Sequence, residues 1–350
     1  MVRERPGRCM AKQLPNSIDM QRTVATRNSP SGVGGRESVR CNFCHADNFD
    51  VVVASGIDRR HGLPGDFRMV KCRQCSLVYL NPRPTAEALS AYYPEDYAPY
   101  VQRGFFGRMT QWLRRREANA LRRTVAAGAE VLEVGCAAGD LMVPLRDAGF
   151  RVTGVELSDH AATIAREQHH LEVHTGALAD APLDGRSFDA VIMRNVIEHV
   201  PDPKGDLARA ATLLRPGGVL VLRTDNVASL DARLFRSLWY GYDFPRHLTL
   251  FSPATLTAYV ESAGLEVTRV QYSLVPTHWI MSLRYWASDR RGISAVAPLL
   301  SPRNPLLLAV AFGIASVQKV TRDSGRFVVL ATKPMAAATK SPTRAQRPAR

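Results

Sequence analysis

Glu133, Gly135 and Gly139 form the most informative pattern in this chain of 350 residues. The apolar stretch 131–134 predicts a strand, and it runs into a turn of tiny residues, with an acid two places before the first glycine. Tiny residues let the backbone approach a ligand closely, and the next helix would present free N–H groups there. Because the acid adds a negative charge at the strand tip, the pattern predicts a pocket for a positively charged nucleoside cofactor.

A dinucleotide fingerprint, G-x-G-x-x-G, is the nearest alternative for this loop. It would need glycine at 137 and 140, where the chain has Ala137 and Asp140, and a buried aspartate would repel a pyrophosphate. The pattern E-x-G-x-x-x-G fits instead, and it resembles the class I S-adenosylmethionine-dependent methyltransferases. The resemblance implies that Glu133 and the loop hold the methionine end of the cofactor. Ala137 replaces the family's usual middle glycine and narrows the loop slightly.

A second acid, Glu156, ends the apolar stretch 151–156, 21 residues after Gly135. This spacing matches that at which a carboxylate accepts hydrogen bonds from both ribose hydroxyls of a nucleotide. The cofactor-binding set that follows from the resemblance also includes Leu157 and Asn195.

Two later segments extend the resemblance. Residues 187–203 resemble the family's fourth strand and the catalytic-face segment behind it, and 214–220 resemble the turn before the fifth strand. The expected fold is α/β, a Rossmann-like sheet of seven strands with one antiparallel strand. We expect helices at 139–148, 160–169, 204–214 and 253–263, and the last three strands at 219–224, 265–270 and 326–332.

Four cysteines form two paired motifs, Cys41-x2-Cys44 and Cys72-x2-Cys75. Two-residue spacing lets both thiolates of a pair face one ion, and two pairs complete a tetrahedral zinc site with no open position. We therefore predict a structural zinc ribbon at 41–80 with an inserted hairpin. Neither Cys9 nor Cys136 has a partner that suggests a disulfide.

Tyrosines follow the ribbon in a linker and basic helix over 81–127. This N-terminal arrangement resembles the sugar C-methyltransferases, in which a zinc-binding module precedes the methyltransferase core. The resemblance makes Tyr92, Tyr93 and Tyr97 candidate contacts to a sugar nucleotide; packing of the linker against the core is the alternative.

Residues 226–252 are expected to cap the acceptor pocket. Four aromatic residues fall within six positions there, beside Asp, Arg and His. Open α/β sheets bind ligands at the carboxyl edge, where this insert begins. Trp239, Tyr242 and Arg246 are the candidate substrate contacts. The insert resembles one found in bacterial methyltransferases linked to surface sugars.

Two histidines could serve as the catalytic base. An oxygen or carbon acceptor must lose a proton, which requires a base with a pKa near neutrality. His199 follows the fourth strand and His247 lies in the expected cap. We slightly favour His199, with Glu198 orienting its ring or sharing the proton.

The net charge of +14 lies largely in two tails. Residues 1–40 hold eight Lys/Arg and three Asp/Glu, and 333–350 hold five Lys/Arg and no acid, so each carries +5. We expect the segments 1–40 and 334–350 to be disordered, flanking a methyltransferase domain at 128–333. The charge is therefore weak support for a nucleic-acid partner.

An apolar helix is expected over 304–320. It is too short to span a bilayer, and we favour a buried core helix, with an interfacial helix or a groove for a lipid-linked acceptor as the alternative. The first forty residues lack the apolar region of a secretory signal. We expect a cytoplasmic protein, with peripheral membrane contact as an option.

Three functions remain open. The favoured one is methyl transfer to a sugar nucleotide or glycan precursor. The second is an O-methyltransferase acting on a lipid or quinone-like acceptor, because the pair Glu198–His199 resembles the ubiquinone-pathway methyltransferases; Asn195 stands where those enzymes often carry another Glu. The third is a nucleic-acid-binding methyltransferase, against which the ribbon offers no aromatic and basic stacking surface.

Overall fold

A seven-stranded sheet organises the chain in the computed structural model, which describes residues 35–93 and 104–335. The strand order is β12-β13-β10-β9-β6-β7-β8, and only β13 runs antiparallel to its neighbours. This confirms the sheet predicted from the sequence. The strands are β6 (Glu130–Val134), β7 (Arg151–Glu156), β8 (Glu172–Thr175), β9 (Phe188–Arg194), β10 (Leu214–Asp225), β12 (Glu266–Tyr272) and β13 (Arg326–Thr332).

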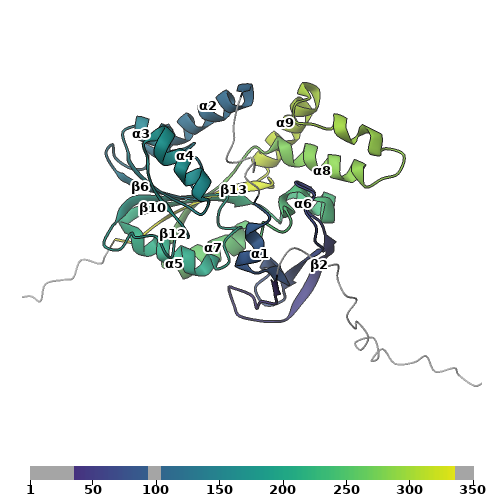
Figure 1. The fold of residues 1–350 in the computed structure, drawn as a ribbon, viewed down its shortest axis with the longest axis horizontal. Coiled ribbons are helices and arrows are strands. Elements are labelled where there is room, and N and C mark those ends of the chain that lie inside the picture. The colour runs from purple at the N-terminus through teal and green to yellow at the C-terminus, as the bar shows by residue number, and fades with distance from the viewer. Residues whose placement is uncertain (1–34, 94–103, 336–350) are drawn as a thin grey trace, which may run out of the picture.

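Helices cover both faces of this sheet (Figure 1). The helices α2 (Gly104–Leu121), α3 (Met142–Asp147) and α4 (Asp159–His169) lie on one side, and α5 (Pro203–Leu213) and α7 (Pro253–Ser262) on the other. The central strands β6 and β9 are buried on both sides, as expected of parallel strands between helices. Helix α3 begins three residues later than predicted, because the turn around Gly139 takes up the first positions.

The N-terminal segment builds a second, antiparallel sheet of four strands, β11-β4-β3-β2. Its strands β2 (Phe49–Gly56), β3 (Phe67–Cys72) and β4 (Val78–Leu80) come from the predicted ribbon. The fourth strand, β11 (Thr249–Leu250), comes from the predicted cap, about 170 residues later in the chain. The pair β1 (Arg36–Glu37) and β5 (Arg83–Pro84) and the short helix α1 (Ala86–Ser90) complete this part. Ribbon and cap are thus one structural unit.

The cap follows β10 as the helix α6 (Leu230–Phe235) and two 3-10 turns, η2 (Arg236–Leu238) and η3 (Tyr240–Tyr242). Its aromatic side chains pack into a core shared with the N-terminal sheet, in which Phe244 stacks on Tyr242 with ring centroids 5.4 Å apart. The cap therefore closes over the carboxyl edge of the large sheet with the N-terminal sheet behind it.

A helical hairpin connects β12 to β13. It consists of α8 (Pro276–Ser288), the 3-10 turn η4 (Ser294–Leu299) and α9 (Pro305–Val320), and it extends from one end of the molecule (Figure 1). The preferred prediction of a buried core helix over 304–320 is wrong, because Leu306 and Val320 are 77% and 82% exposed. Within the described residues, no helix is both long and apolar enough to cross a bilayer.

Candidate active site

The loop after β6 adopts the backbone that its tiny residues allow. Gly135 and Gly139 have φ of +67° and +88°, and Ala137 has φ of +48°. A Cβ on Gly135 would lie 2.3 Å from Cγ2 of Val196, so a side chain is excluded there by packing as well as by conformation. The loop therefore lets its backbone come close to a ligand bound at the carboxyl ends of the strands.

Glu133 is the buried acid at the tip of β6. Its Oε1 lies 3.9 Å from Nη1 of Arg194, and its Oε2 has no hydrogen-bond partner among the described residues. Burial raises the pKa of Glu133 to about 7, although the charge of Arg194 opposes the shift. A buried carboxylate with an unsatisfied oxygen fits a cationic group such as the sulfonium or ammonium of S-adenosylmethionine.

Glu156 ends β7 and stabilises the loop. Its Oε2 accepts from the N–H of Ala137 at 2.8 Å, and its Oε1 accepts from the N–H of Ser158 at 2.9 Å. Each oxygen keeps a lone pair for a ribose hydroxyl. Leu157, next along the chain, is 74% exposed and offers an apolar surface beside this carboxylate.

Asn195 follows β9 and contacts both the catalytic segment and β10. Its amide Nδ2 donates to Oε1 of Glu198 at 3.0 Å, and its Oδ1 accepts from Nε of Arg223 at 3.1 Å. The residue has φ of +55°, a conformation that asparagine tolerates better than most residues. Its hydrogen bond holds Glu198 in place.

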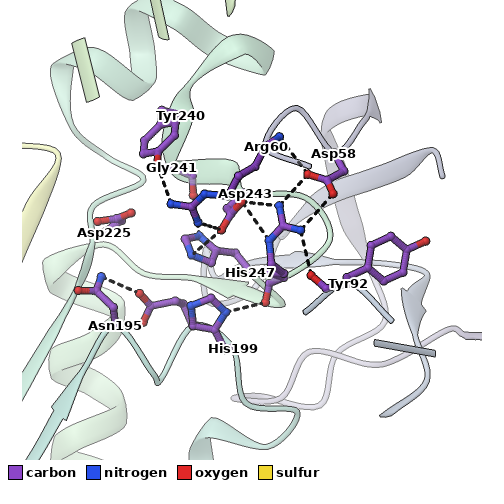
Figure 2. A network of polar contacts seen from close by, with 12 residues as sticks. Asp58, Arg60, Tyr92, Asn195, His199, Asp225, Tyr240, Gly241, Asp243 and His247 are labelled. Carbon is purple, nitrogen blue, oxygen red and sulfur yellow. Dashed lines mark hydrogen bonds and ion pairs between the residues drawn. The ribbon is translucent and has the colours of Figure 1, made fainter. Parts of the chain in front are cut away.

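Three residues predicted to act in catalysis lie close together at the carboxyl edge of the large sheet (Figure 2). Glu198 and His199 follow β9, His247 comes from the cap, and one ligand atom of each lies within 4.8 Å of the others. The imidazole centroids of the two histidines are 4.6 Å apart. The structure therefore brings together side chains separated by almost fifty positions.

Hydrogen bonds set the tautomers of both rings. Nδ1 of His247 lies 2.7 Å from the carbonyl of Gly241, and Nδ1 of His199 lies 3.0 Å from the carbonyl of Arg246. Since a carbonyl only accepts, each Nδ1 carries the proton, and each Nε2 keeps a lone pair. Both rings can therefore accept a proton at Nε2.

Burial shapes the protonation of this cluster. It lowers the pKa of His199 to about 4 and lowers the pKa of His247, while it raises the pKa of Glu198. Both histidines are neutral at pH 7, and the pKa of His199 lies below the near-neutral value expected of the base. Oε2 of Glu198 has no partner among the described residues. Such a cluster can take up a proton or, with three ligand atoms, a divalent cation.

The tyrosines predicted to contact the substrate have different surroundings where the structure describes them. The hydroxyl of Tyr93 lies 2.9 Å from Nδ1 of His199, at the cluster. Tyr92 is buried and its hydroxyl donates to the carbonyl of Pro64 at 2.8 Å, which is a packing contact. Tyr97 lies outside the described residues. Of the two tyrosines that the structure describes, Tyr93 is thus the one beside a candidate base.

The predicted cap contacts Trp239, Tyr242 and Arg246 are all buried. Nε1 of Trp239 donates to Asp231 at 2.8 Å, and Tyr242 stacks on Phe244. Arg246 donates to Asp58 and Asp243 and is fully buried. These contacts hold the cap together, so acceptor binding by the three residues stays a prediction.

A charged network behind His247 was missed by sequence reasoning. Asp58, from the connection between β2 and β3, and Asp243 flank Arg246, and Arg60 donates to Asp243 at 2.8 Å (Figure 2). Asp243 could have been suspected from its place in the aromatic cap. Nothing in the sequence around Asp58 indicates that it meets a residue 188 positions away.

The four cysteines form a cluster in the N-terminal sheet. Sγ of Cys41 is 3.4 Å from Sγ of Cys75, Sγ of Cys44 is 3.5 Å from Sγ of Cys72, and all four lie within 4.8 Å of one another. A tetrahedral zinc with Zn–S bonds of about 2.3 Å places sulfurs ~3.8 Å apart. The donor set and its spacing therefore fit a zinc ion.

Comparisons with known proteins agree with the fold. A family model described as a methyltransferase domain matches residues 105–270. A ubiquinone biosynthesis O-methyltransferase of Aromatoleum aromaticum is 34% identical over 161 residues, covering 41% of this chain and 67% of the relative. The enzyme of the same name from Albidiferax ferrireducens is 32% identical over 190 residues, covering 48% and 71%.

Among solved structures, magnesium protoporphyrin IX methyltransferase from Synechocystis aligns with a TM-score of 0.46 and 15% identity, over 70% of this chain and 97% of that one.

The curated relatives, together with the family model, settle the class: the chain belongs to the class I S-adenosylmethionine-dependent methyltransferases. It is a methyltransferase, and the family implies S-adenosylmethionine as its cofactor.

Proposed function

We propose that the protein transfers a methyl group from S-adenosylmethionine to a hydroxyl oxygen of a small, quinone-like acceptor. The relatives named ubiquinone biosynthesis O-methyltransferases support this acceptor class over the sugar nucleotide favoured from the sequence. These alignments cover less than half of this chain, so the acceptor is a proposal rather than a transferred activity.

The cofactor would lie across the carboxyl ends of β6 and β7. Glu133 would face its cationic methionine end, and Glu156 would accept from the ribose hydroxyls. The proposed set is completed by Gly135, Ala137, Gly139, Leu157 and Asn195. When bound, S-adenosylmethionine supplies a methyl group on a sulfonium that becomes a neutral thioether after transfer.

The cluster of Glu198, His199 and His247 is the observation that carries the proposal. A hydroxyl acceptor loses its proton as the O–CH3 bond forms and the S–CH3 bond breaks. The neutral Nε2 of His199 or His247 takes that proton, and Glu198 stabilises the imidazolium that results. Burial by the cap excludes water, which would compete for the methyl group.

We also propose that the four cysteines hold a structural zinc ion. A site of four sulfurs leaves no open position for substrate, so its contribution is to the N-terminal sheet. Because that sheet shares β11 with the cap, the ion would help to hold the cap over the acceptor.

A sugar nucleotide or glycan precursor is the second candidate acceptor. The contact of Tyr93 with His199 favours it, because the resemblance to sugar C-methyltransferases assigns tyrosines after the zinc module to the substrate. Cytoplasmic location and the absence of a nucleic-acid partner stay predictions from the sequence.

The test is transfer of labelled methyl to a panel of hydroquinones, with and without an apolar tail, and of nucleotide sugars. We expect label on the hydroquinones and its loss in Glu133→Gln and His199→Asn. Label on the nucleotide sugars alone would move the function to the second candidate. Label on neither class would contradict both.

A further inference from the structure

Helix α9 has an apolar stripe on the side that faces solvent, whereas a helix packed on a core turns its apolar side toward that core. Leu306, Val310, Gly313, Val317 and Val320 follow one another at intervals of three and four residues. They share a solvent-facing side, and the four with large side chains are between 63% and 82% exposed. A surface helix of a globular protein normally turns polar residues to solvent.

An apolar groove lies beside this stripe. It has a volume of about 410 Å³ and lies between α6, α8 and α9. All of its lining side chains are apolar, among them Phe235, Trp279, Trp286 and Ile314. Together with the stripe and the exposed Leu234, the groove forms a large apolar surface. Soluble proteins rarely leave an apolar surface of this size uncovered.

The hairpin, residues 276–322, carries a net positive charge. Its single acid, Asp289, pairs with Arg59 at 2.7 Å. Within the described parts of the chain, none of its cations forms an ion pair with an acid. The cations lie near the ends of α8 and α9, apart from one within α8, and they are Arg284, Arg290, Arg291, Arg303, Lys319 and Arg322.

We propose that the hairpin is a docking surface for a membrane that carries anionic lipids. The apolar stripe of α9 would enter the boundary between headgroups and acyl chains, and the cations would contact lipid phosphates. Trp286, with the guanidinium of Arg290 4.3 Å above its ring, suits the same interfacial depth. The proposal is independent of the acceptor proposed above.

A second copy of the chain fits this surface less well. Two hairpins, each with six cations and one paired acid, would repel one another across an apolar contact. A bilayer with anionic headgroups instead offers the complementary charge. At 16 residues, α9 is about 24 Å long, which suits a helix lying in the interface rather than crossing it.

The hairpin is fixed to the candidate active site. Gln318 of α9 donates to Asp231 at 3.0 Å and accepts from Nε1 of Trp279 at 2.6 Å. His278 of α8 lies between Asp231 and Asp225, with its ring nitrogens 3.4 and 3.6 Å from their oxygens. Docking of the hairpin would therefore hold the carboxyl edge of the sheet at a set distance from the lipid.

Co-sedimentation of the full chain with vesicles tests the proposal. The vesicles are phosphatidylcholine with and without phosphatidylglycerol. The stripe variant is Leu306→Asp with Val317→Asp, and the charge variant is Arg291→Gln with Arg303→Gln. The matched control, Val51→Asp with Val52→Asp, changes two exposed valines on β2, which is not part of the hairpin. All six positions are exposed, so folding is expected to survive.

We expect binding to the anionic vesicles only. It should fall at least about tenfold in the stripe variant and about fivefold for each arginine removed, and stay unchanged in the control. If the stripe variant binds as well as the wild type, other basic segments carry the binding and the proposal is wrong. Absence of wild-type binding, with a dimer that the stripe variant dissociates, would overturn it in favour of self-association.

Discussion

Arg246 in the cap and Asp58 in the N-terminal sheet form a two-pronged ion pair that is fully shielded from solvent. Nη2 of Arg246 lies 2.7 Å from Oδ1 of Asp58, and Nη1 lies 3.1 Å from Oδ2. The backbone carbonyl of the same arginine accepts from Nδ1 of His199. The pair therefore joins two segments of the chain and also fixes the backbone that orients a candidate base.

Removal of this arginine should destabilise the protein strongly. Arg246→Met leaves Asp58 buried without its ion-pair partner and leaves Asp243 with Arg60 alone, and breaking a buried pair typically costs about 3–5 kcal/mol. Urea denaturation measures the loss in free energy of unfolding. Arg73→Met is the control, because its ion pair with Asp50 is exposed and should leave the midpoint nearly unchanged. Equal midpoints for both variants would show that the network contributes little.

At low pH, the contribution of the same network to the free energy of unfolding should be lost. Burial alone would raise the pKa of Asp58 and Asp243, but the neighbouring arginines outweigh it and lower both pKa values. A lowered folded pKa stabilises the fold above the unfolded value of about 3.9, and this contribution is lost as pH falls from there through the folded values. The variant Arg246→Met should therefore lose less stability than the wild type between about pH 4 and pH 2.

Cofactor affinity should depend on pH through Glu133. Burial raises its pKa to about 7, and a cationic cofactor requires the carboxylate, so binding releases a proton. We expect the dissociation constant for S-adenosylmethionine to rise about tenfold for each pH unit below 7. Calorimetry in buffers of different ionisation enthalpy measures both quantities.

The matched variant is Glu133→Gln, which keeps the shape of the side chain. It should weaken cofactor binding by roughly 10- to 100-fold at pH 8, as expected for loss of a charged hydrogen-bond acceptor, and abolish the pH dependence. A dissociation constant that stays flat from pH 6 to 8 in the wild type would remove Glu133 from the cofactor site.

The two histidines should affect turnover and not cofactor affinity. We expect His199→Asn or His247→Asn to lower kcat by about 10²- to 10⁴-fold, the usual contribution of a general base, with an unchanged dissociation constant for the cofactor. Since burial holds the pKa of His199 near 4, kcat/KM for the acceptor, measured at saturating cofactor, should decline only as pH falls toward about 4. A strong requirement for an added divalent cation would instead make the cluster a metal site and contradict the base assignment.

Much of the fold follows from local sequence patterns. The turn from Glu133 to Gly139 could be predicted because its φ angles and its close packing demand tiny residues in order along the chain. The cysteine pairs were equally readable, since two-residue spacing brings their sulfurs together within one turn. Chemistry encoded by neighbours in sequence is thus visible before the structure.

Contacts between distant segments could not be read in this way. Pairing of β11 with β4 and the ion pair of Asp58 with Arg246 join segments over 160 residues apart, and no local preference encodes them. The apolar residues of α9 misled the prediction for a related reason. Hydrophobicity shows that a helix is apolar, whereas its exposure depends on which elements cover it, and Leu306 remains uncovered.

Zinc should be present at one ion per chain and should stabilise the N-terminal sheet. Cys72→Ser removes one of four sulfurs within 4.8 Å of one another, so we expect the ion to be lost and the thermal midpoint to fall by several degrees or more. Elemental analysis by mass spectrometry and thermal unfolding provide the two readouts.

The control for zinc content is Cys136→Ser, in the loop after β6. This variant should keep its zinc, because the sulfur of Cys136 lies outside the cluster. Because β4 of this sheet pairs with β11 of the cap, loss of zinc should also lower turnover even though no ligand touches the acceptor. A wild-type protein that contains no zinc, or a Cys72→Ser variant that retains it, would contradict the assignment.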